Sequence, residues 1–397
     1  MLAGVRDTLQ AMVPELFPMP KSCAPLRFVP MVAILLSVAS WAGEGAIRSE
    51  RITFRIATLV RGLSHPWSIA FLPDGRMLIT ERAGRLRLVS RDFRLDEVPV
   101  SGVPPVATGA QSGLFDVVLH PRYVQNGWLY LAYMAEDRSG SSLQVLRARL
   151  EGHRLAEARV VFRAHPAVRG TLNLGGRLAF DRRGLLYVSV GDRFQQERAQ
   201  RLDDDSGKVV RLTDDGAMPA DNPYANRPDA RPEIYTVGNR NIEGMAFHPR
   251  TGELWTHEHG PQGGDEVNVL RAGRNYGWPV ITYGVNYGTG TKIGEGTHKD
   301  GMEQPLYYWV PSIAPSGMAF YTGDRYPEWR GNLFVGALKA QTLVRLELDG
   351  ESVTHEERLL EGVLGRIRDV RVGPDGYLYL LTDESKGVLA RLEPVKR

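Results

Sequence analysis

The stretch LAFDRRGLLYVSVGD, residues 178–192, contains an apolar strand, a polar turn and a second apolar strand, the pattern typical of a β-hairpin. Versions of this pattern recur as IAFLPDGRMLITE (69–81), VVLHPRYVQNGWLYLAY (117–133), MAFHPRTGELWTHEHG (245–260), MAFYTGDRYPEWRGNLFVGAL (318–338) and VRVGPDGYLYLLTDE (370–384). One hairpin cannot bury its apolar face, but six can if each belongs to a small sheet and the sheets pack around an axis. The repeat therefore predicts an all-β fold, a six-bladed β-propeller. The alternative is an all-β sandwich in which the similarity of the hairpins is coincidental.

The composition agrees with one globular domain that contains many turns. The chain has 397 residues, of which 43 are Gly and 25 are Pro, and the even spread of the repeat favours a single propeller domain over residues 50–397. The formal charge of +3, without a dense Lys/Arg block, gives no reason to expect nucleic acid or an anionic membrane as a partner. The only cysteine, Cys23, precedes this domain, which therefore contains no thiol and agrees with an oxidising compartment.

Residues 1–42 depart from the propeller pattern and are predicted to be a leader that contains a secretory signal peptide. Lys21 and Arg27 precede an apolar run, residues 28–42, which ends in Ser-Trp-Ala with small residues where signal peptidase reads. The run is shorter than the roughly 20 residues of a membrane span, so we expect export without stable membrane insertion. An uncleaved anchor is the alternative, and translation from Met19 would shorten the leader.

Two segments exceed the repeat and are expected to carry the functional site, because loops on a rigid frame usually do. They are residues 192–245 and 260–318, both rich in Gly, Asn, Asp, Pro and Tyr. In the first segment Arg240 precedes a strand and is expected at the channel mouth, where it is suited to bind a carboxylate. The alternative is an arginine that stabilises its own loop by bonding main-chain carbonyls.

The second segment has the oxygen donors that calcium prefers. Gly260 and Pro261 offer main-chain carbonyls in an irregular backbone, and Asp265 and Glu266 are adjacent carboxylates, with Tyr276 ten residues after Glu266. The spacing does not match an EF-hand loop, and a solvated acidic turn explains the composition equally well.

Cations near the ends of later strands suggest an anionic guest. Lys339 lies in GALKAQ, and Arg366 and Arg368 alternate in GRIRDV, so that they share one face of a strand. Such pairs are usually solvated surface, but with Arg240 they come from different blades and favour a polyanionic ligand in the channel.

Taken together, these motifs resemble the soluble PQQ-dependent aldose sugar dehydrogenases. The resemblance runs from about His65 to Glu384 and covers nearly all of the expected mature chain. It rests on an ordered series of motifs: HPW, AQSGLFDVVLHP, GGRLAFD, RNIEGMAF, EHGPQGGDEVN, NYGWP, SGMAFY, GALK and RIRDV. The family fold is a six-bladed propeller, in agreement with the repeat.

The resemblance implies PQQ and Ca²⁺ as cofactors and aldose sugars as substrates, which would be oxidised to lactones with electrons passed to an external acceptor. It implies that the residues at the cofactor are Gln111, Arg240, Asn241, Lys339, Arg366 and Arg368. It implies calcium ligation through the carbonyls of Gly260 and Pro261, and a second calcium bound by Glu266 and the carbonyl of Tyr276. A cationic pocket suits the three carboxylates of PQQ, and Arg240 would stabilise charge on the quinone oxygen.

One departure concerns the catalytic base. The family places a histidine four residues before the arginine of GGRL, and this chain has Asn173 there. An amide orients a sugar hydroxyl but cannot take its proton, a loss that typically costs 10²- to 10⁴-fold. Candidate replacements are Asp192, which is otherwise a loop-orienting residue, His165, or a water molecule.

The remaining histidines form no cluster with metal-ligand spacing. His257 and His259 alternate and are spaced for zinc, but we expect one to face the channel and the other to pack in the core.

Three functions remain open at this point. The leading one is a periplasmic or secreted bacterial quinoprotein, monomeric or homodimeric, that oxidises aldoses. The second is a PQQ- or carbohydrate-binding propeller without catalysis, because Asn173 replaces the base. The third is a calcium-dependent lactonase, which the set of cations argues against.

Overall fold

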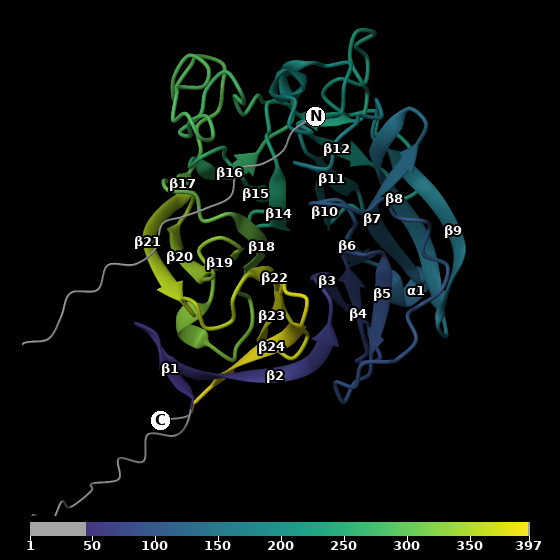
Figure 1. The fold of residues 1–397 in the computed structure, drawn as a ribbon, viewed down its shortest axis with the longest axis vertical. Helices are drawn as coiled ribbons and strands as arrows, with labels where there is room; N and C mark the ends of the chain where they lie inside the picture. The colour runs from purple at the N-terminus through teal and green to yellow at the C-terminus, as the bar shows by residue number, and fades with distance from the viewer. Residues whose placement is uncertain (1–44, 396–397) are drawn as a thin grey trace, which may run out of the picture. The chain divides into compact units, whose positions relative to one another are not determined.

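The computed structural model describes residues 45–395, which form six antiparallel sheets arranged around a central axis (Figure 1). Each of the six hairpins quoted above supplies the first two strands of one sheet. The predicted six-bladed β-propeller is therefore confirmed, and the sandwich is excluded. The predicted leader, residues 1–42, lies outside the described residues. Within residues 45–395 no helix is long and apolar enough to cross a membrane.

The strands follow one another outward from the axis in each blade. Blade one contains β3 (Pro66–Phe71), β4 (Met77–Glu81) and β5 (Arg85–Val89). Blade two contains β6 (Leu114–Leu119), β7 (Trp128–Asp137), β8 (Gly140–Glu151) and β9 (Arg154–Arg163). Blade three contains β10 (Gly175–Phe180), β11 (Leu186–Val190), β12 (Lys208–Leu212) and β13 (Ile234–Thr236).

The other three blades repeat this order. Blade four contains β14 (Ile242–Phe247), β15 (Leu254–Glu258), β16 (Asp265–Leu270) and β17 (Tyr307–Trp309). Blade five contains β18 (Pro315–Phe320), β19 (Leu333–Ala337), β20 (Leu343–Asp349) and β21 (Ser352–Leu359). Blade six contains β22 (Ile367–Val372), β23 (Leu378–Thr382) and β24 (Gly387–Pro394), followed by β2 (Thr53–Leu63) and β1 (Ala46–Arg48). Short helical turns are α1 (Tyr123–Asn126), η1 (Gln196–Gln200) and η2 (Pro327–Trp329).

Blade six closes the ring because it combines strands from both ends of the domain. β2 pairs antiparallel with β24 from Phe54 opposite Pro394 to Leu63 opposite Gly387. Figure 1 shows β2, in purple, beside the yellow β24. Closure removes the open strand edges that the first and last blades would otherwise present.

The innermost strand of every blade carries an irregularity of register in its first half. The breaks lie at Pro66/Ser68, Leu114/Val117, Gly175/Leu178, Ile242/Gly244, Pro315/Met318 and Ile367/Asp369. A bulge at this position bends the strand and redirects its side chains. The repetition explains how polar residues from all six blades reach the axis while the following residues remain apolar.

The hydrophobic core is divided among the blade interfaces. Its main clusters each join two neighbouring blades, for example Leu78 of blade one with Leu131 of blade two and Trp255 of blade four with Val335 of blade five. The interface between blades five and six buries Phe54, whose ring lies 5.6 Å from that of Trp329. The closing strand is thus held by packing as well as by its hydrogen bonds.

We expect Phe54→Ala to lower the free energy of unfolding by about 3–5 kcal/mol, because it leaves a cavity beneath the closing strand. Urea unfolding of the purified protein measures this change. Val124→Ala is the matched control, since Val124 is 79% exposed and its loss should cost less than about 0.5 kcal/mol. Equal midpoints for the two variants would contradict the role given to this contact.

Candidate functional site

A buried ion network occupies the propeller axis. Arg177, from β10, is buried, and its Nη1 lies 2.9 Å from Asp369 Oδ1 and 3.6 Å from Asp116 Oδ1. Its Nε donates to the Glu243 carbonyl at 2.6 Å, and its guanidinium covers the Trp67 ring at 4.1 Å. These contacts join residues from five blades beside the cavity described next.

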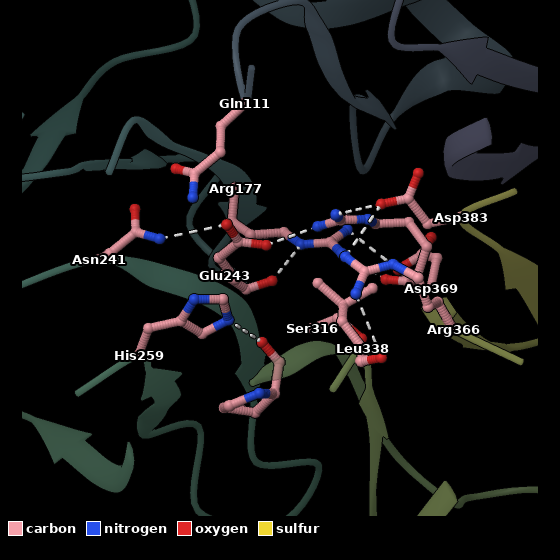
Figure 2. Close-up of polar contacts among 12 residues, drawn as sticks. Gln111, Arg177, Asn241, Glu243, His259, Ser316, Leu338, Arg366, Asp369 and Asp383 are labelled. Atoms are coloured by element: carbon pink, nitrogen blue, oxygen red, sulfur yellow. Dashed lines mark hydrogen bonds and ion pairs between the residues drawn. The ribbon is translucent and has the colours of Figure 1, made fainter. Parts of the chain in front are cut away.

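An axial cavity of about 200 Å³ lies beside this network. All six blades contribute to its wall, which is formed by Trp67, Arg82, Gln111, Phe115, Leu174, Gly175, Glu243, His259, Ala314, Leu338, Arg366 and Arg368. Figure 2 shows Gln111 and His259 on one side of this region and Arg366 and Asp383 on the other. The wall combines aromatic rings with guanidinium groups, as a pocket for a flat anion requires.

Of the four cations expected to hold an anion, two line this cavity. Arg368 is buried and bonded to Glu243 at 2.6 Å and to Asp383 at 2.7 Å. Arg366 is half-buried and makes only long contacts, at 3.4 Å to the Leu338 carbonyl and 3.7 Å to Asp383. Arg366 therefore retains more capacity than Arg368 to bind a ligand.

The cations that line this cavity are not all those expected from the motifs. Lys339 is exposed and does not line the axial cavity, although Leu338 beside it does. Arg82, which the motif reading did not single out, does line it and lies 3.9 Å from Asp383. Burial alone would raise the pKa of Asp383, but the Arg368 guanidinium holds that pKa well below its ordinary value. Asp383 is thus an anionic anchor for three arginines, and it was also missed from sequence.

Gln111 and Asn241 hold the segment that forms one wall of the axial cavity. Gln111 Oε1 accepts from the main-chain amide of Asn173 at 2.7 Å, and Asn241 Oδ1 accepts from the main-chain amide of Gly175 at 2.9 Å. Asn241 also donates to Glu243 at 3.1 Å. Gln111 lines the axial cavity, whereas Asn241 lines neither cavity and bonds two residues that line the axial one, Gly175 and Glu243.

A second cavity of about 320 Å³, here called the outer cleft, opens toward solvent. It is lined by Asp192, Phe194, Gln195, Gln196, Glu197, Arg240, Pro261, Trp278, Asn286, Tyr287 and Ile293. One loop contributes to both cavities, because His259 lines the axial cavity and Pro261 lines the outer cleft.

Arg240 lines the outer cleft and is held by main-chain oxygens of the loop that contains His259 and Gly260. Its Nη1 donates to the carbonyls of His259 at 2.9 Å and Gly260 at 2.7 Å, and its guanidinium lies 5.2 Å from the Trp278 ring. Its Nε is buried without a hydrogen-bond partner among the described residues. Arg240 therefore bonds loop carbonyls, as the alternative interpretation expected, and it also lines a cavity.

Asp192 is the carboxylate at the buried end of the outer cleft. It is 1% exposed, and it accepts from Asn173 Nδ2, the Phe194 amide and Trp278 Nε1, each at 2.8 Å. Burial raises the pKa of Asp192, whereas the Arg240 charge and the Asn173 hydrogen bond lower it. Asn173 thus orients Asp192 directly, and a carboxylate with a raised pKa is suited to proton transfer.

The acidic residues proposed for calcium, Asp265 and Glu266, lie on β16, and a third carboxylate, Glu258, lies on the paired strand β15. Glu258 and Glu266 are directly opposite in the β15–β16 register, and Asp265 precedes Glu266. Burial, reinforced by the neighbouring Glu258 carboxylate, raises the pKa of Glu266. Like charges in opposite positions repel each other unless a cation or proton intervenes.

The expected calcium ligands are not all free in this arrangement. The Gly260 carbonyl accepts from Arg240, and Asp265 accepts from the amides of Gly260, Ile313 and Ala314. Tyr276 is buried, and its hydroxyl donates to the Val269 carbonyl at 2.7 Å. Within residues 45–395 no three His, Cys, Asp or Glu side chains form a metal-holding group, so a calcium site here depends on main-chain oxygens.

The histidines divide as expected between channel and core. His259 lines the axial cavity, and its Nε2 lies 2.6 Å from the Pro315 carbonyl. His257 is fully buried, and burial keeps its pKa well below the ordinary value. His165 is exposed and lines neither cavity, which leaves Asp192 as the residue in reach of the outer cleft.

Comparisons with known proteins place this site in a family. The model of the glucose/sorbosone dehydrogenases matches residues 63–391, and the chain belongs to that family. The aldose sugar dehydrogenase YliI of Escherichia coli (strain K12) is 44% identical over 367 residues, which covers 91% of this chain and 96% of that protein.

Two solved structures agree with this assignment. The soluble aldose sugar dehydrogenase of Escherichia coli in its apo-form has a TM-score of 0.84 and 44% identity, covering 86% of this chain and 100% of that one. The PQQ-bound aldose sugar dehydrogenase of Streptomyces coelicolor has a TM-score of 0.69 and 26% identity, covering 86% and 98%. The resemblance drawn from the motifs is confirmed.

Arg193 ties the Asp192 loop to blade two. Its buried guanidinium donates to Ser141 O at 2.9 Å, Ser141 Oγ at 2.8 Å, Val168 O at 3.0 Å and Gly170 O at 2.7 Å. Its amide donates to the Asn173 carbonyl at 3.0 Å. The Arg193 side chain therefore anchors the loop that carries Asp192, and its main-chain amide contacts Asn173.

Arg193→Met is expected to lower the free energy of unfolding by about 3–5 kcal/mol, because several buried acceptors lose a charged donor at once. Chemical denaturation monitored by tryptophan fluorescence gives the value. The control is Arg169→Met, which replaces an exposed arginine and should change stability by less than about 0.5 kcal/mol. A small effect at position 193 would mean that the loop holds its shape without this tether.

Proposed function

We propose that this chain is a PQQ- and calcium-dependent dehydrogenase that oxidises aldose sugars to lactones and passes the electrons to an external acceptor. The observation that carries the proposal is the arrangement of an arginine-lined axial cavity beside an outer cleft that contains the buried carboxylate of Asp192. Family membership supports the same reading. We further propose that the protein acts in the periplasm or is secreted.

The axial cavity fits PQQ in the chemistry of its walls. PQQ is a flat tricarboxylate, and the wall has the guanidiniums of Arg82, Arg366 and Arg368 together with the rings of Trp67 and Phe115. Arg366 would bind a carboxylate most readily, because its present contacts are long. When bound, PQQ would supply the acceptor for the hydride that the sugar loses, and the hydride carries both electrons of the oxidation.

The residues also fit calcium, with a rearrangement. The paired carboxylates of Glu258 and Glu266 favour a nearby cation, and Glu266 with the Tyr276 carbonyl would hold the structural ion. The carbonyls of Gly260 and Pro261 would hold the ion beside the cofactor, and the Gly260 carbonyl would then release or share Arg240.

The reacting sugar would lie in the outer cleft with its anomeric hydroxyl against Asp192. An Asp192 oxygen would take the hydroxyl proton, while the Asn173 amide and Trp278 Nε1 keep the carboxylate in place. Arg240 is fixed by two main-chain carbonyls and would stabilise negative charge that develops on the quinone oxygen. A carboxylate thus supplies the base that Asn173 does not.

We expect the protein, reconstituted with PQQ and calcium, to reduce a dye in the presence of aldoses, and Asp192→Asn to lower kcat by 10²- to 10⁴-fold. Absorbance titration should give the same PQQ affinity for this variant as for the wild type. Asp203→Asn, the same change at an exposed position outside both cavities, should leave the rate unchanged.

Asn173→His distinguishes the proposed dehydrogenase from a PQQ-binding propeller without catalysis. Activity only in this variant would mean that the pocket is intact and that catalysis was lost at position 173, as a PQQ-binding protein without turnover requires. Lactone hydrolysis that needs calcium but no PQQ would replace the proposal with the lactonase.

The pH dependence follows from the state of Asp192. The base is the deprotonated carboxylate, so kcat/KM should fall as the pH decreases through the raised pKa of Asp192, above its ordinary value of 3.8. Asn173→Ala removes a donor that lowers this pKa, and the acid limb should move to higher pH by about one unit. Stopped-flow dye reduction across the pH range gives both profiles. An identical acid limb in Asn173→Ala would exclude Asp192 as the titrating group.

A further inference from the structure

Two aromatic side chains stand exposed at the solvent end of the outer cleft. Phe194 is 55% exposed and Tyr287 is 56% exposed, whereas Asp192 in the same cleft is 1% exposed. The two rings are nearly parallel, with centroids 6.4 Å apart and planes inclined by 24°. They come from different loops, so the pair is assembled by the fold and not by local sequence.

The backbone is strained where it presents Phe194. Arg193 has φ of 61° and Phe194 has φ of 58°, a left-handed conformation that a bulky residue rarely adopts. The Phe194 amide donates to Asp192 Oδ1 at 2.8 Å, which holds the Phe194 backbone beside the proposed base. Strain of this kind gathers at functional sites, and a ring that remains mostly in solvent returns little stability.

Tyr287 is presented by a loop with its own support. The Gln262 and Val285 amides donate to each other's carbonyls at 3.1 and 3.3 Å, and the Gly288 amide donates to Gln262 Oε1 at 3.3 Å. The platform formed by Phe194 and Tyr287 therefore rests on anchored segments on both sides.

The chemistry at this end of the cleft fits a neutral polyol. Gln195, Gln196 and Asn286 contribute amide groups that bond hydroxyls, and Glu197 is the single charged residue beside them. Pyranose rings have apolar faces of C–H groups that pack against aromatic rings, whose faces carry negative potential. A sugar does not fit between the rings, because contact on both faces needs about 8 Å, so it would pack on the outer surface of the pair.

We propose that Phe194 and Tyr287 bind the second saccharide unit of a reducing oligosaccharide whose terminal aldose lies against Asp192. The inference rests on the proposed function, because it takes the buried end of the cleft as the reaction site. The exposed platform then contacts the next unit outward, and the chain favours oligosaccharides over free hexoses.

The test compares glucose, maltose and maltotriose in the wild type, Phe194→Asn and Tyr287→Ala. Asn is tolerated in the left-handed region, so Phe194→Asn removes the ring and keeps the backbone. Dye reduction by the protein reconstituted with PQQ and calcium gives kcat/KM for each sugar, and calorimetric titration gives binding that does not depend on turnover. Phe194→Tyr should retain the wild-type preference. Tyr308→Ala removes an exposed ring outside the cleft and is the matched control.

We expect the maltotriose-to-glucose ratio of kcat/KM to exceed one in the wild type and to fall roughly three- to tenfold in each ring-removing variant, with a matching increase in Kd for maltotriose. Phe194→Asn should also keep or raise the Tm, since strain is relieved and little packing is lost. An unchanged ratio would overturn the inference, as would a rise in KM for the dye alone, which would assign the platform to the acceptor. Ring-dependent maltotriose binding without turnover would support the platform while contradicting the proposed oxidation.

Discussion

The structure depends on one buried guanidinium at its axis. Arg177 contacts Asp116, Asp369, the Glu243 carbonyl and the face of Trp67, and so links the inner strands of most blades. Arg371 adds a second positive charge, with contacts of 2.8 Å to Asp116 and 3.0 Å to Asp369. Two cations and two anions balance here, and removal of one would leave an uncompensated buried charge at a cost of about 3–5 kcal/mol. The axial cavity is rigid because this network lies directly beside it.

The inner strands of the ring also form much of the wall of the axial cavity. Each inner strand is bulged near its start, and the residues just before or within the bulge are those that form the walls, among them Gly175 and Glu243. Asp192, just after β11, and Arg240, just before β14, line the outer cleft instead. The walls of the two cavities thus arise from successive parts of the repeat.

Much of this could be predicted from sequence, for identifiable reasons. The hairpin repeat determined the blade number, and motif order placed Gln111, Arg366 and Arg368, all of which line the axial cavity. Lys339 followed the same logic yet is exposed outside that wall. Motif position alone does not reveal the direction of a long side chain.

The residues that were missed depend on three-dimensional relations. Arg82 and Asp383 come from chain segments about 300 residues apart, and their proximity requires the closed ring. The opposition of Glu258 and Glu266 follows from strand register, which spacing does not give. The positive φ and the exposure of Phe194 are properties of the folded chain, so the sequence did not single this residue out.

Pairing of β2 with β24 also has a consequence for biosynthesis. The sixth blade is completed only when β24 has left the ribosome, because its partner β2 is made at the opposite end of the domain. Until then the nascent chain has two unpaired edges and cannot lock into the ring. The ring therefore closes after translation, when the two ends of the domain meet in blade six.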